Sequence, residues 1–266
     1  MVRNKLPAIL LLFALLSCGA TLFLVFADDS QARAARQLST AYPDFIITVE
    51  NNSVIWKDKT VTLFDDGKTG KTWLETLNSP DLQDQLALPY PKKYTLPFLP
   101  GKNEDPGRIR NEEFFKKMYG STKKEIESHL AAIRWMPLVS NEVVYVTTVN
   151  NIDKKLMQVS AELEKLPSQY RKYITRIGGT YNYRFIKDSK RLSMHSFGIA
   201  IDMNVDNSEY WNWDYNNELD DIVYRNRMPY EIAAIFEKYG FIWGGKWYHY
   251  DTMHFEYRPE LLVEIK

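Results

Sequence analysis

Two short apolar segments in the second half of the chain each enclose histidine and carboxylate side chains. The first, residues 193–202, has the sequence SMHSFGIAID, and the second, residues 251–256, has the sequence DTMHFE. Imidazole and carboxylate groups are costly to bury unless they are paired or bind a metal. Two histidines and one carboxylate, with a fourth coordination position left for water, are the ligand set of a hydrolytic zinc site. We therefore expect a fold that brings the two segments together around a metal ion.

The first segment predicts a bend followed by a short strand. Gly198 permits the sharp bend, and residues 199–202 have the apolar character of a strand. Side chains alternate along a strand, so Ala200 and Asp202 share one face while the two isoleucines enter the core. The small Ala200 side chain leaves room beside Asp202 for a metal and a substrate. His195, just before the bend, is then able to turn toward the same face.

The second segment predicts another strand, with a carboxylate just before it. His254 and Glu256 share one face of this strand, and Asp251 precedes it, where it is able to face a metal-bound water. Zinc lowers the pKa of such a water toward ~7, and we expect Asp251 to take its proton and return it to the leaving amine. Glu256 is predicted to orient a metal ligand. A cation is expected to stabilise the transition state, and Arg184 is the best-placed arginine by sequence.

Length and charge limit the class of protein. At 266 residues the chain is long enough for one or two domains with a substantial core. It carries 34 basic and 34 acidic residues, so the charge balance does not point to a nucleic-acid partner. The single cysteine, Cys18, lies in the N-terminal apolar segment, which excludes a disulfide framework in the remainder. Stability is therefore expected from core packing and from any bound metal.

The first residues have the features of a targeting segment, and we assign residues 1–27 as a signal peptide or membrane anchor. Arg3 and Lys5 give a positive start, and residues 6–27 are nearly all apolar. A plausible cleavage site ends at Ala27, but the apolar run also reaches the ~20 residues that span a bilayer. Both forms predict an exported protein of the periplasm or cell envelope, either released or anchored in the inner membrane.

Strand-like runs precede the half of the chain that carries the motifs. Three β-branched and aromatic runs, separated by polar turns, predict a small meander at residues 45–49, 53–56 and 60–64. Residues 80–107 are rich in proline and polar side chains and predict a connector on the surface. We therefore divide the rest of the chain into residues 28–100, strand-rich with a connector, and residues 101–266, which carry both motifs.

A loop after the third run contains two adjacent acidic residues, Asp65 and Asp66, followed by Gly67. A calcium loop needs further acidic ligands at regular spacing, and these do not follow. The sequence therefore predicts a turn at this position.

Helices and strands alternate in the second half. Thr122 and Glu125 form a capping box that predicts a helix running to about Arg134. Pro229 begins another helix, and Gly240 is placed to end it. The remaining patterns predict a helix at residues 152–163 and strands at residues 142–149, 180–185, 199–203, 241–243 and 253–257. This order predicts an α+β fold with a small, mostly antiparallel sheet flanked by helices.

The two motifs together resemble those of a known family. Ser-x-His followed by Gly, Ala and Asp, and later by Asp-x-x-His, is similar to the VanY-like D-alanyl-D-alanine peptidases, zinc peptidases grouped with lysostaphin and the hedgehog signalling domain. The resemblance implies a zinc site of His195, Asp202 and His254, with Asp251 as the catalytic base. It also implies that Arg184, at the family's Tyr-x-Arg position, stabilises the transition state. Residues 101–266 would then be a zinc peptidase domain with a hedgehog- or D-Ala-D-Ala-peptidase-like fold.

The resemblance also implies a substrate, the stem peptide of peptidoglycan. The family contains D-Ala-D-Ala carboxypeptidases and L-Ala-D-Glu endopeptidases, and the motifs do not separate the two. A different class of function is a non-catalytic module that binds the cell wall or another ligand and retains the zinc fold. Such a module is expected to lose a ligand or the base, whereas all four positions are filled here. The enzyme is therefore the favoured interpretation.

Three further residues are predicted to contact the substrate: Ser193, Tyr183 and Trp247. Ser193 is able to donate a hydrogen bond to a substrate carboxylate, or merely to cap a turn. Trp247 belongs to a group of aromatic residues that either line the cleft or pack in the core. His249 is expected to line the pocket without binding the metal.

Overall fold

The structure is a computed structural model that describes residues 30–92, 99–213, 215 and 222–264. The predicted targeting segment, residues 1–27, lies outside these described residues, which begin in a helix that ends at residue 41. None of the helices in the described ranges has the length and apolar character needed to cross a membrane.

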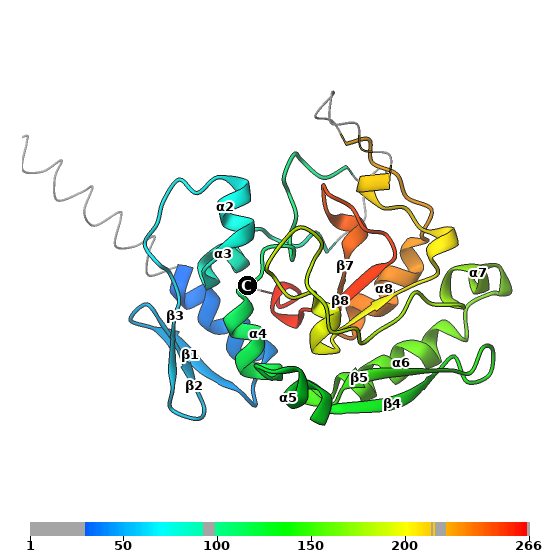
Figure 1. Cartoon of the computed structure of the whole chain (residues 1–266), viewed down its shortest axis with the longest axis horizontal. Helices are drawn as coiled ribbons and strands as arrows, with labels where there is room; N and C mark the ends of the chain where they lie inside the picture. Colours follow the sequence, from blue (N-terminus) through cyan, green and yellow to red (C-terminus); the bar gives the residue numbers. More distant parts are fainter. Residues whose placement is uncertain (1–29, 93–98, 214, 216–221, 265–266) are drawn as a thin grey trace, which may run out of the picture.

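The predicted meander is confirmed at one end of the molecule (Figure 1). Strand β1 (Ile46–Glu50) pairs antiparallel with β2 (Ser53–Trp56), and β2 pairs antiparallel with β3 (Val61–Leu63). Asn51 and Asn52 both have positive φ, as the two-residue turn between β1 and β2 requires.

Two short helices follow the meander, and one lies in the stretch predicted as a connector. Helix α2 (Trp73–Asn78) and helix α3 (Leu82–Ala87) each begin with a capping box, formed by Thr72 with Glu75 and by Asp81 with Asp84. The prediction of a plain connector over residues 80–107 is therefore wrong at its start. Pro80 suggested a break, but the capping box immediately after it starts a new helix.

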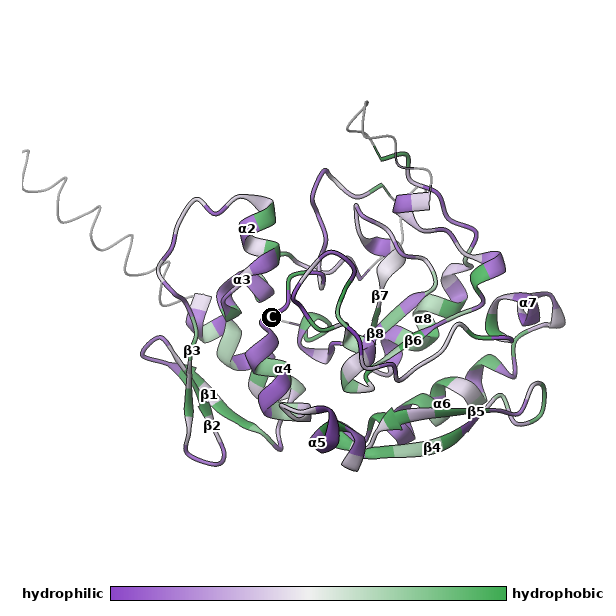
Figure 2. Cartoon of the chain, in the orientation of Figure 1, coloured by the Kyte–Doolittle hydropathy of each residue, from purple (hydrophilic) through white to green (hydrophobic). Residues whose placement is uncertain are grey.

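The helix predicted from Thr122 is shorter than expected. Its capping box is present, but α5 (Lys123–Ser128) ends six residues before Arg134. The next residues form β4 (Leu130–Trp135), which pairs antiparallel with β5 along its whole length. Figure 2 shows a hydrophilic α5 followed by a largely hydrophobic β4. Pairing with the next strand, β5 (Glu142–Thr147), therefore overrides the local helical pattern.

The sheet that carries the two motifs has the order β6-β8-β7, with both pairings antiparallel. The strand predicted at residues 180–185 is wrong, because among the described residues that stretch makes only one isolated bridge, Phe185 to Leu192. Its backbone instead bonds to the bend before β6, for example from Asn182 N–H to the His195 carbonyl at 3.2 Å. The remaining elements are α4 (Glu112–Tyr119), β5 (Glu142–Thr147), α6 (Ile152–Leu163), α7 (Arg171–Ile174), β6 (Ala200–Asp202), α8 (Tyr230–Lys238), β7 (Phe241–Trp243) and β8 (His254–Tyr257).

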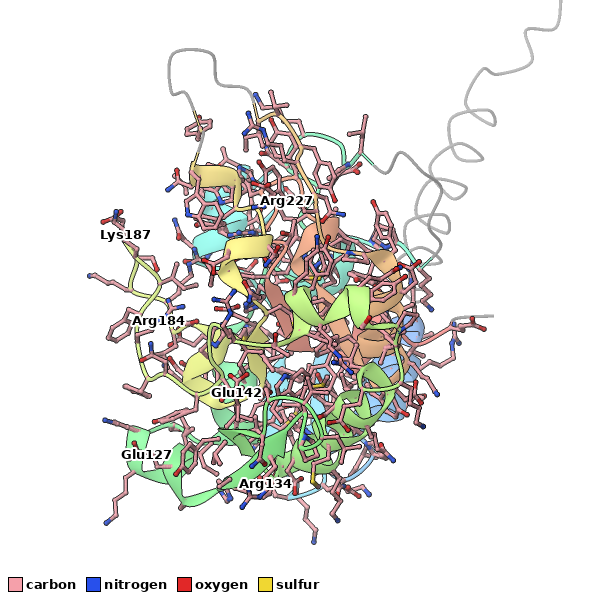
Figure 3. All side chains as sticks on the ribbon, turned by 90° about the vertical axis from the view of Figure 1, so that its right-hand side faces the viewer. Glu127, Arg134, Glu142, Arg184, Lys187 and Arg227 are labelled. Carbon is pink, nitrogen blue, oxygen red and sulfur yellow. The ribbon has the colours of Figure 1, made fainter. Side chains whose placement is uncertain are left out.

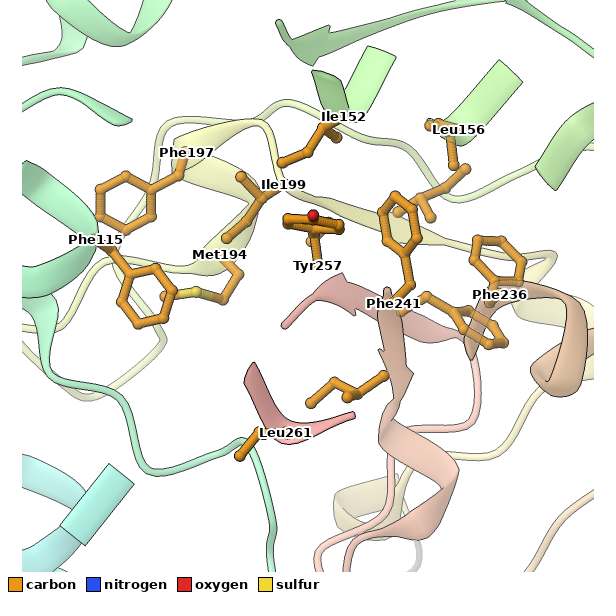
Figure 4. Close-up of a cluster of buried hydrophobic side chains, with 14 of the residues drawn as sticks. Phe115, Ile152, Leu156, Met194, Phe197, Ile199, Phe236, Phe241, Tyr257 and Leu261 are labelled. Carbon is orange, nitrogen blue, oxygen red and sulfur yellow. The ribbon is translucent and has the colours of Figure 1, made fainter. Parts of the chain in front are cut away.

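A cluster of buried apolar and aromatic side chains joins these elements (Figure 4). Phe236 of α8 stacks on Phe255 of β8 with 4.0 Å between ring centroids, and Phe241 of β7 meets Tyr257 edge-on at 5.3 Å. Full burial of one such side chain contributes ~1.5–3 kcal/mol. The cluster includes side chains of the meander and of the half of the chain that carries the two motifs. The α+β class with small antiparallel sheets is thus confirmed.

Candidate metal centre and active site

Strand pairing between β6 and β8 brings the two sequence motifs together. Asp202 lies directly opposite His254, and Ala200 lies opposite Glu256. Residues opposite each other in an antiparallel pair project from the same face. Asp202 and His254 therefore lie on the same face of this sheet, as their positions in the two predicted strands require.

The bend before β6 turns His195 onto this surface. His195 lies in a single 3-10 turn, Met194–Phe197, which ends at Gly198 with φ of 67°. A Cβ at Gly198 would lie 2.8 Å from Leu130 Cδ2 and 3.0 Å from the Thr147 backbone nitrogen. Only glycine fits both the backbone conformation and this close approach to β4 and β5.

The three predicted ligands form one compact cluster. His195 Nε2 lies 3.2 Å from Asp202 Oδ2, and His254 Nδ1 lies 3.1 Å from Asp202 Oδ1. The two histidine nitrogens are 3.3 Å apart. Ligand atoms ~2.0–2.1 Å from a tetrahedral zinc are about 3.3 Å from one another. The donor set and its spacing therefore fit a zinc ion with one coordination position open.

Hydrogen bonds to the other ring nitrogens fix which nitrogen of each histidine faces the cluster. His195 Nδ1 lies 2.6 Å from the Thr180 carbonyl oxygen, so it donates, and the lone pair is left on Nε2. His254 Nε2 lies 2.9 Å from Glu256 Oε2, which leaves the lone pair on Nδ1. Such partners orient metal-binding imidazoles and raise their basicity.

Glu256 is fully buried and held by two arginines. Arg110 donates to both carboxylate oxygens of Glu256, and Arg258 Nη1 donates to Oε1 at 3.0 Å. Burial disfavours the charged form, but Arg110 and then His254 hold the pKa of Glu256 below its usual range. Glu256 therefore remains an acceptor for His254. Sequence reasoning missed Arg110, because it lies 146 positions away from Glu256 and outside both motifs.

The charge state of the cluster depends on the same contacts. Burial disfavours the Asp202 carboxylate, but His195 and then His254 lower the pKa of Asp202. Burial also disfavours a charged His254, yet the hydrogen bonds that its ring donates to Asp202 and Glu256 raise the pKa of His254 to about 9. In the metal-free protein the cluster therefore retains a proton at neutral pH, and a metal must displace it.

Asp251 lies beside this cluster, immediately before β8. Its backbone N–H donates to the Gly244 carbonyl at 3.0 Å, and its Oδ1 is buried without a hydrogen-bond partner among the described residues. Burial, and next the charge of Asp202, raise the pKa of Asp251. A carboxylate with a raised pKa is suited to accept and return a proton near neutral pH.

Arg184 lies on an exposed loop (Figure 3). Its backbone N–H bonds to Ser196 Oγ at 2.9 Å, but its side chain forms no hydrogen bond or ion pair with the part of the chain that the structure describes. His254, and after it a different arginine, Arg108, oppose the rise in the pKa of Asp251. No local sequence pattern indicates Arg108, which precedes both motifs. The role of Arg184 stays a prediction.

The three predicted substrate contacts differ in their surroundings. Ser193 is buried, and its Oγ accepts from the His195 backbone N–H at 3.3 Å, which is the turn-capping role. Trp247 is buried, with its ring 5.7 Å from the His254 ring and its Nε1 donating to the Pro106 carbonyl at 2.6 Å. Tyr183 is half-buried against the core.

His249 does not join the metal ligands. Its Nδ1 lies 2.6 Å from the buried Asp105 carboxylate, and its ring stacks on Trp73 of α2 with 4.5 Å between centroids. Trp211 meets the other side of this ring edge-on at 4.8 Å. Trp73, which follows the meander in sequence, thus packs against His249 in the half of the chain that carries the two motifs.

A second group of potential ligands, Asp65, Asp66 and Asp81, lies beside α3. Lys71 Nζ lies 3.0 Å from Asp66 and from Asp81 of this group, and 2.6 Å from the neighbouring Asp84. An ammonium group therefore already pairs with two of the three carboxylates.

Comparison with known proteins points to the same chemistry as the geometry. Residues 187–257 match the family model described as D-alanyl-D-alanine carboxypeptidase. No curated protein and no solved structure matches the chain. The match includes all three clustered ligands and Asp251, and it confirms the resemblance found in the sequence. Residues 187–257 are therefore similar to the D-alanyl-D-alanine carboxypeptidase family, which supports a peptidase.

Proposed function

We propose that this protein is a zinc-dependent metallopeptidase that hydrolyses a peptide bond in the stem peptide of peptidoglycan. The observation that carries the proposal is the trio of His195 Nε2, Asp202 and His254 Nδ1 at the spacing of zinc ligands, with the Asp251 carboxylate beside it. Bound zinc would supply a water of lowered pKa and polarise the substrate carbonyl. The family match supports the peptidase class, and the ligand set supports the metal.

The chain's own groups have separate tasks in this proposal. Asp251, whose buried Oδ1 has no partner among the described side chains, takes a proton from the attacking water and returns it to the leaving amine. Glu256 holds His254 in one tautomer and orientation. Arg184 is assigned to the negative charge that develops on the carbonyl oxygen, as the family resemblance implies.

We also propose that the protein acts outside the cytoplasm. The support is the N-terminal sequence, in which a positive start precedes a long apolar run. Export would place the site in the periplasm or cell envelope, where stem peptides occur. The same run would serve as an inner-membrane anchor if it is retained.

The test uses full-length, zinc-loaded protein and purified muropeptides, with the products identified by mass. Release of free D-alanine would establish a carboxypeptidase, and separation of L-alanine would establish an endopeptidase. Asp251→Asn serves as the inactive control. If zinc binds and no stem peptide is cleaved, the enzyme proposal fails, and a binding module that retains the zinc fold becomes the better account.

A further inference from the structure

A line of buried hydrogen bonds runs outward from the predicted metal ligand His254. His254 Nε2 contacts Glu256 Oε2 at 2.9 Å, and the other oxygen of Glu256 accepts from Arg258 Nη1 at 3.0 Å. Arg258 Nε donates to Glu260 Oε1 at 2.5 Å, and Glu260 Oε2 accepts from the Tyr42 hydroxyl at 2.6 Å. All five side chains are buried. This buried line therefore connects the metal site to a residue 218 positions before Glu260.

The far end of the buried line lies at the N-terminal helix. Tyr42 directly follows the helix that ends at residue 41, and its backbone N–H bonds to the Leu38 carbonyl at 2.9 Å. Gln37, inside this helix, donates from its side chain to the Glu260 backbone carbonyl at 3.2 Å. The N-terminal helix thus holds Glu260 through both the carboxylate and the backbone of that residue.

The charges along the buried line are fixed by its own contacts. Burial disfavours the charged form of Arg258, but Glu260 and then Glu256 raise the pKa of Arg258, so it remains a cation. Burial, and next the charge of Glu260, raise the pKa of Tyr42, so its hydroxyl keeps the proton that it donates. Arg258 therefore shares one positive charge between two carboxylates, and one of these, Glu256, is the partner of His254.

Packing of the N-terminal helix does not require a polar line. Its apolar side chains Ala34 and Leu38 already lie in the core cluster. Replacing a buried ion pair by apolar side chains of similar volume often leaves stability unchanged or improves it. Hydrogen bonds between charged groups, by contrast, are short and directional. The buried line is therefore better suited to orienting His254 than to attaching the helix.

We propose that Tyr42 and Glu260 are positioning residues for the metal centre, through which the N-terminal helix sets the orientation and the basicity of His254. Glu260 takes up part of the positive charge of Arg258, which leaves more of the Glu256 charge for His254. A partner of this kind raises the basicity of a metal-binding imidazole. This inference rests on the metal site of the proposed function. It adds a support that lies outside the matched residues, 187–257.

The first test measures zinc affinity in the full-length protein, by competition with a chelator at a temperature where every variant is folded. Glu260→Gln keeps the shape of the side chain but removes its charge, and it is expected to weaken zinc binding by about 10-fold, the low end of the effect of a direct partner. Tyr42→Phe keeps the ring in the core and is expected to weaken binding by about 2- to 5-fold, because one hydrogen bond is lost.

The double variant tests whether the two residues act in series. Because the effect of Tyr42 passes through Glu260, Tyr42→Phe is expected to have no further effect on zinc affinity once Glu260→Gln is present. Additive losses would mean that Tyr42 acts on the metal site by another route, and they would overturn the proposed line.

Tyr119→Phe is the matched control, because it removes a hydroxyl from an equally buried tyrosine outside the line. The Tyr119 hydroxyl accepts from Asn150 Nδ2 at 3.0 Å. This variant is expected to lose thermal stability and to keep the zinc affinity of the wild type. The same result in both Glu260→Gln and Tyr42→Phe would overturn the proposal, because it would make the buried line structural only.

Proton NMR of the zinc-free, full-length protein separates this inference from the proposed function. An imidazole N–H held by a buried carboxylate gives a downfield resonance, which is assigned to His254 by its loss in His254→Gln. The resonance is expected to move upfield in Glu260→Gln and to stay in place in Tyr119→Phe. An unmoved resonance in Glu260→Gln would reject the positioning role even if stem peptides are cleaved. A moved resonance without cleavage of any stem peptide would support the line and reject the peptidase.

Discussion

Among the described residues, two clusters each bring three potential metal ligands within 4.8 Å of one another, and one of the two is suited to hold a metal. In the cluster of Asp65, Asp66 and Asp81 every donor is a carboxylate, and Lys71 lies among them. In the cluster of His195, Asp202 and His254 two donors are imidazoles whose outer nitrogens are tied to Thr180 and Glu256. The comparison teaches that proximity of ligands is insufficient. A metal site also needs fixed lone pairs and no built-in cation.

The largest effect is expected when a ligand is removed from the histidine cluster, which tests whether this cluster and not the acidic one binds the metal. His254→Ala is expected to abolish both stoichiometric zinc binding and peptidase activity, because it removes one of three protein ligands. Bound zinc is measured by elemental analysis of the purified protein. Asp66→Asn, in the other cluster, is the control and is expected to retain one zinc per chain. Equal zinc loss in both variants would mean that the acidic cluster also binds metal.

The second prediction separates metal binding from proton transfer within the histidine cluster. Asp251→Asn is expected to keep zinc and to lower kcat by roughly 10²–10⁴-fold, the usual contribution of a general base. Zinc content and kcat are measured on the same preparation. Loss of zinc in this variant would make Asp251 a ligand and would refute the role assigned to it.

The third prediction concerns the buried carboxylate that supports His254. Glu256→Gln is expected to weaken zinc affinity by about 10- to 100-fold. It is also expected to lower the free energy of unfolding by ~3–5 kcal/mol, because Arg110 and Arg258 lose their shared partner. Competition with a chelator and denaturant unfolding give the two quantities. Glu113→Gln, at an exposed position of α4, is expected to change neither.

The fourth prediction uses the proton held by the metal-free cluster. The pKa of His254 is raised from 6.5 to about 9, so its protonation stabilises the metal-free fold fully below pH 6.5, and this stability is lost as the pH rises toward 9. Zinc must displace that proton, so zinc affinity is expected to rise about tenfold per pH unit over the same range. Unfolding and zinc titrations from pH 6.5 to 8.5 check both trends. A zinc affinity independent of pH would contradict the assignment.

The smallest effect is expected in the acidic cluster. Lys71→Met removes the central cation and is expected to lower the free energy of unfolding by ~1–3 kcal/mol, with partial recovery in millimolar calcium. Lys68→Met is the control, because Lys68 is largely exposed and contacts only Asp66 among these carboxylates. If Lys71→Met unfolds no more readily than Lys68→Met, the ammonium group does not stabilise this loop.

The metal cluster was predictable because each motif combines a local pattern with a fixed chemistry. Short apolar runs predicted β6 and β8, and ligands placed on the alternating faces of two antiparallel strands meet when those strands pair. The meander was predictable for the same reason, since its turns and strands are local. These features depend on neighbours in sequence, or on the pairing of two recognisable strands.

Other features depend on partners that no local pattern reveals. The residues of β4 continue an amphipathic pattern begun by α5, and only pairing with β5 decides against the helix. Arg108 and Arg110 precede the motifs by many residues and meet Trp247 and Glu256 only in the folded chain. The contact between Lys71 and the aspartates was likewise not predictable, because the sequence of a loop does not show which groups a charged side chain contacts.

The bend at Gly198 couples zinc binding to the stability of the folded protein. The Gly198 carbonyl accepts the Thr147 backbone N–H at 3.0 Å, so the turn that carries His195 is attached to the end of β5 as well as to β6. A zinc ion bound by His195, Asp202 and His254 would then cross-link this turn, and with it β5, to β6 and β8. Binding to the folded chain alone adds RT ln(1 + [Zn]/Kd) to its stability. If zinc binds as proposed, the resistance of the folded protein to proteolysis would therefore rise with the concentration of free zinc.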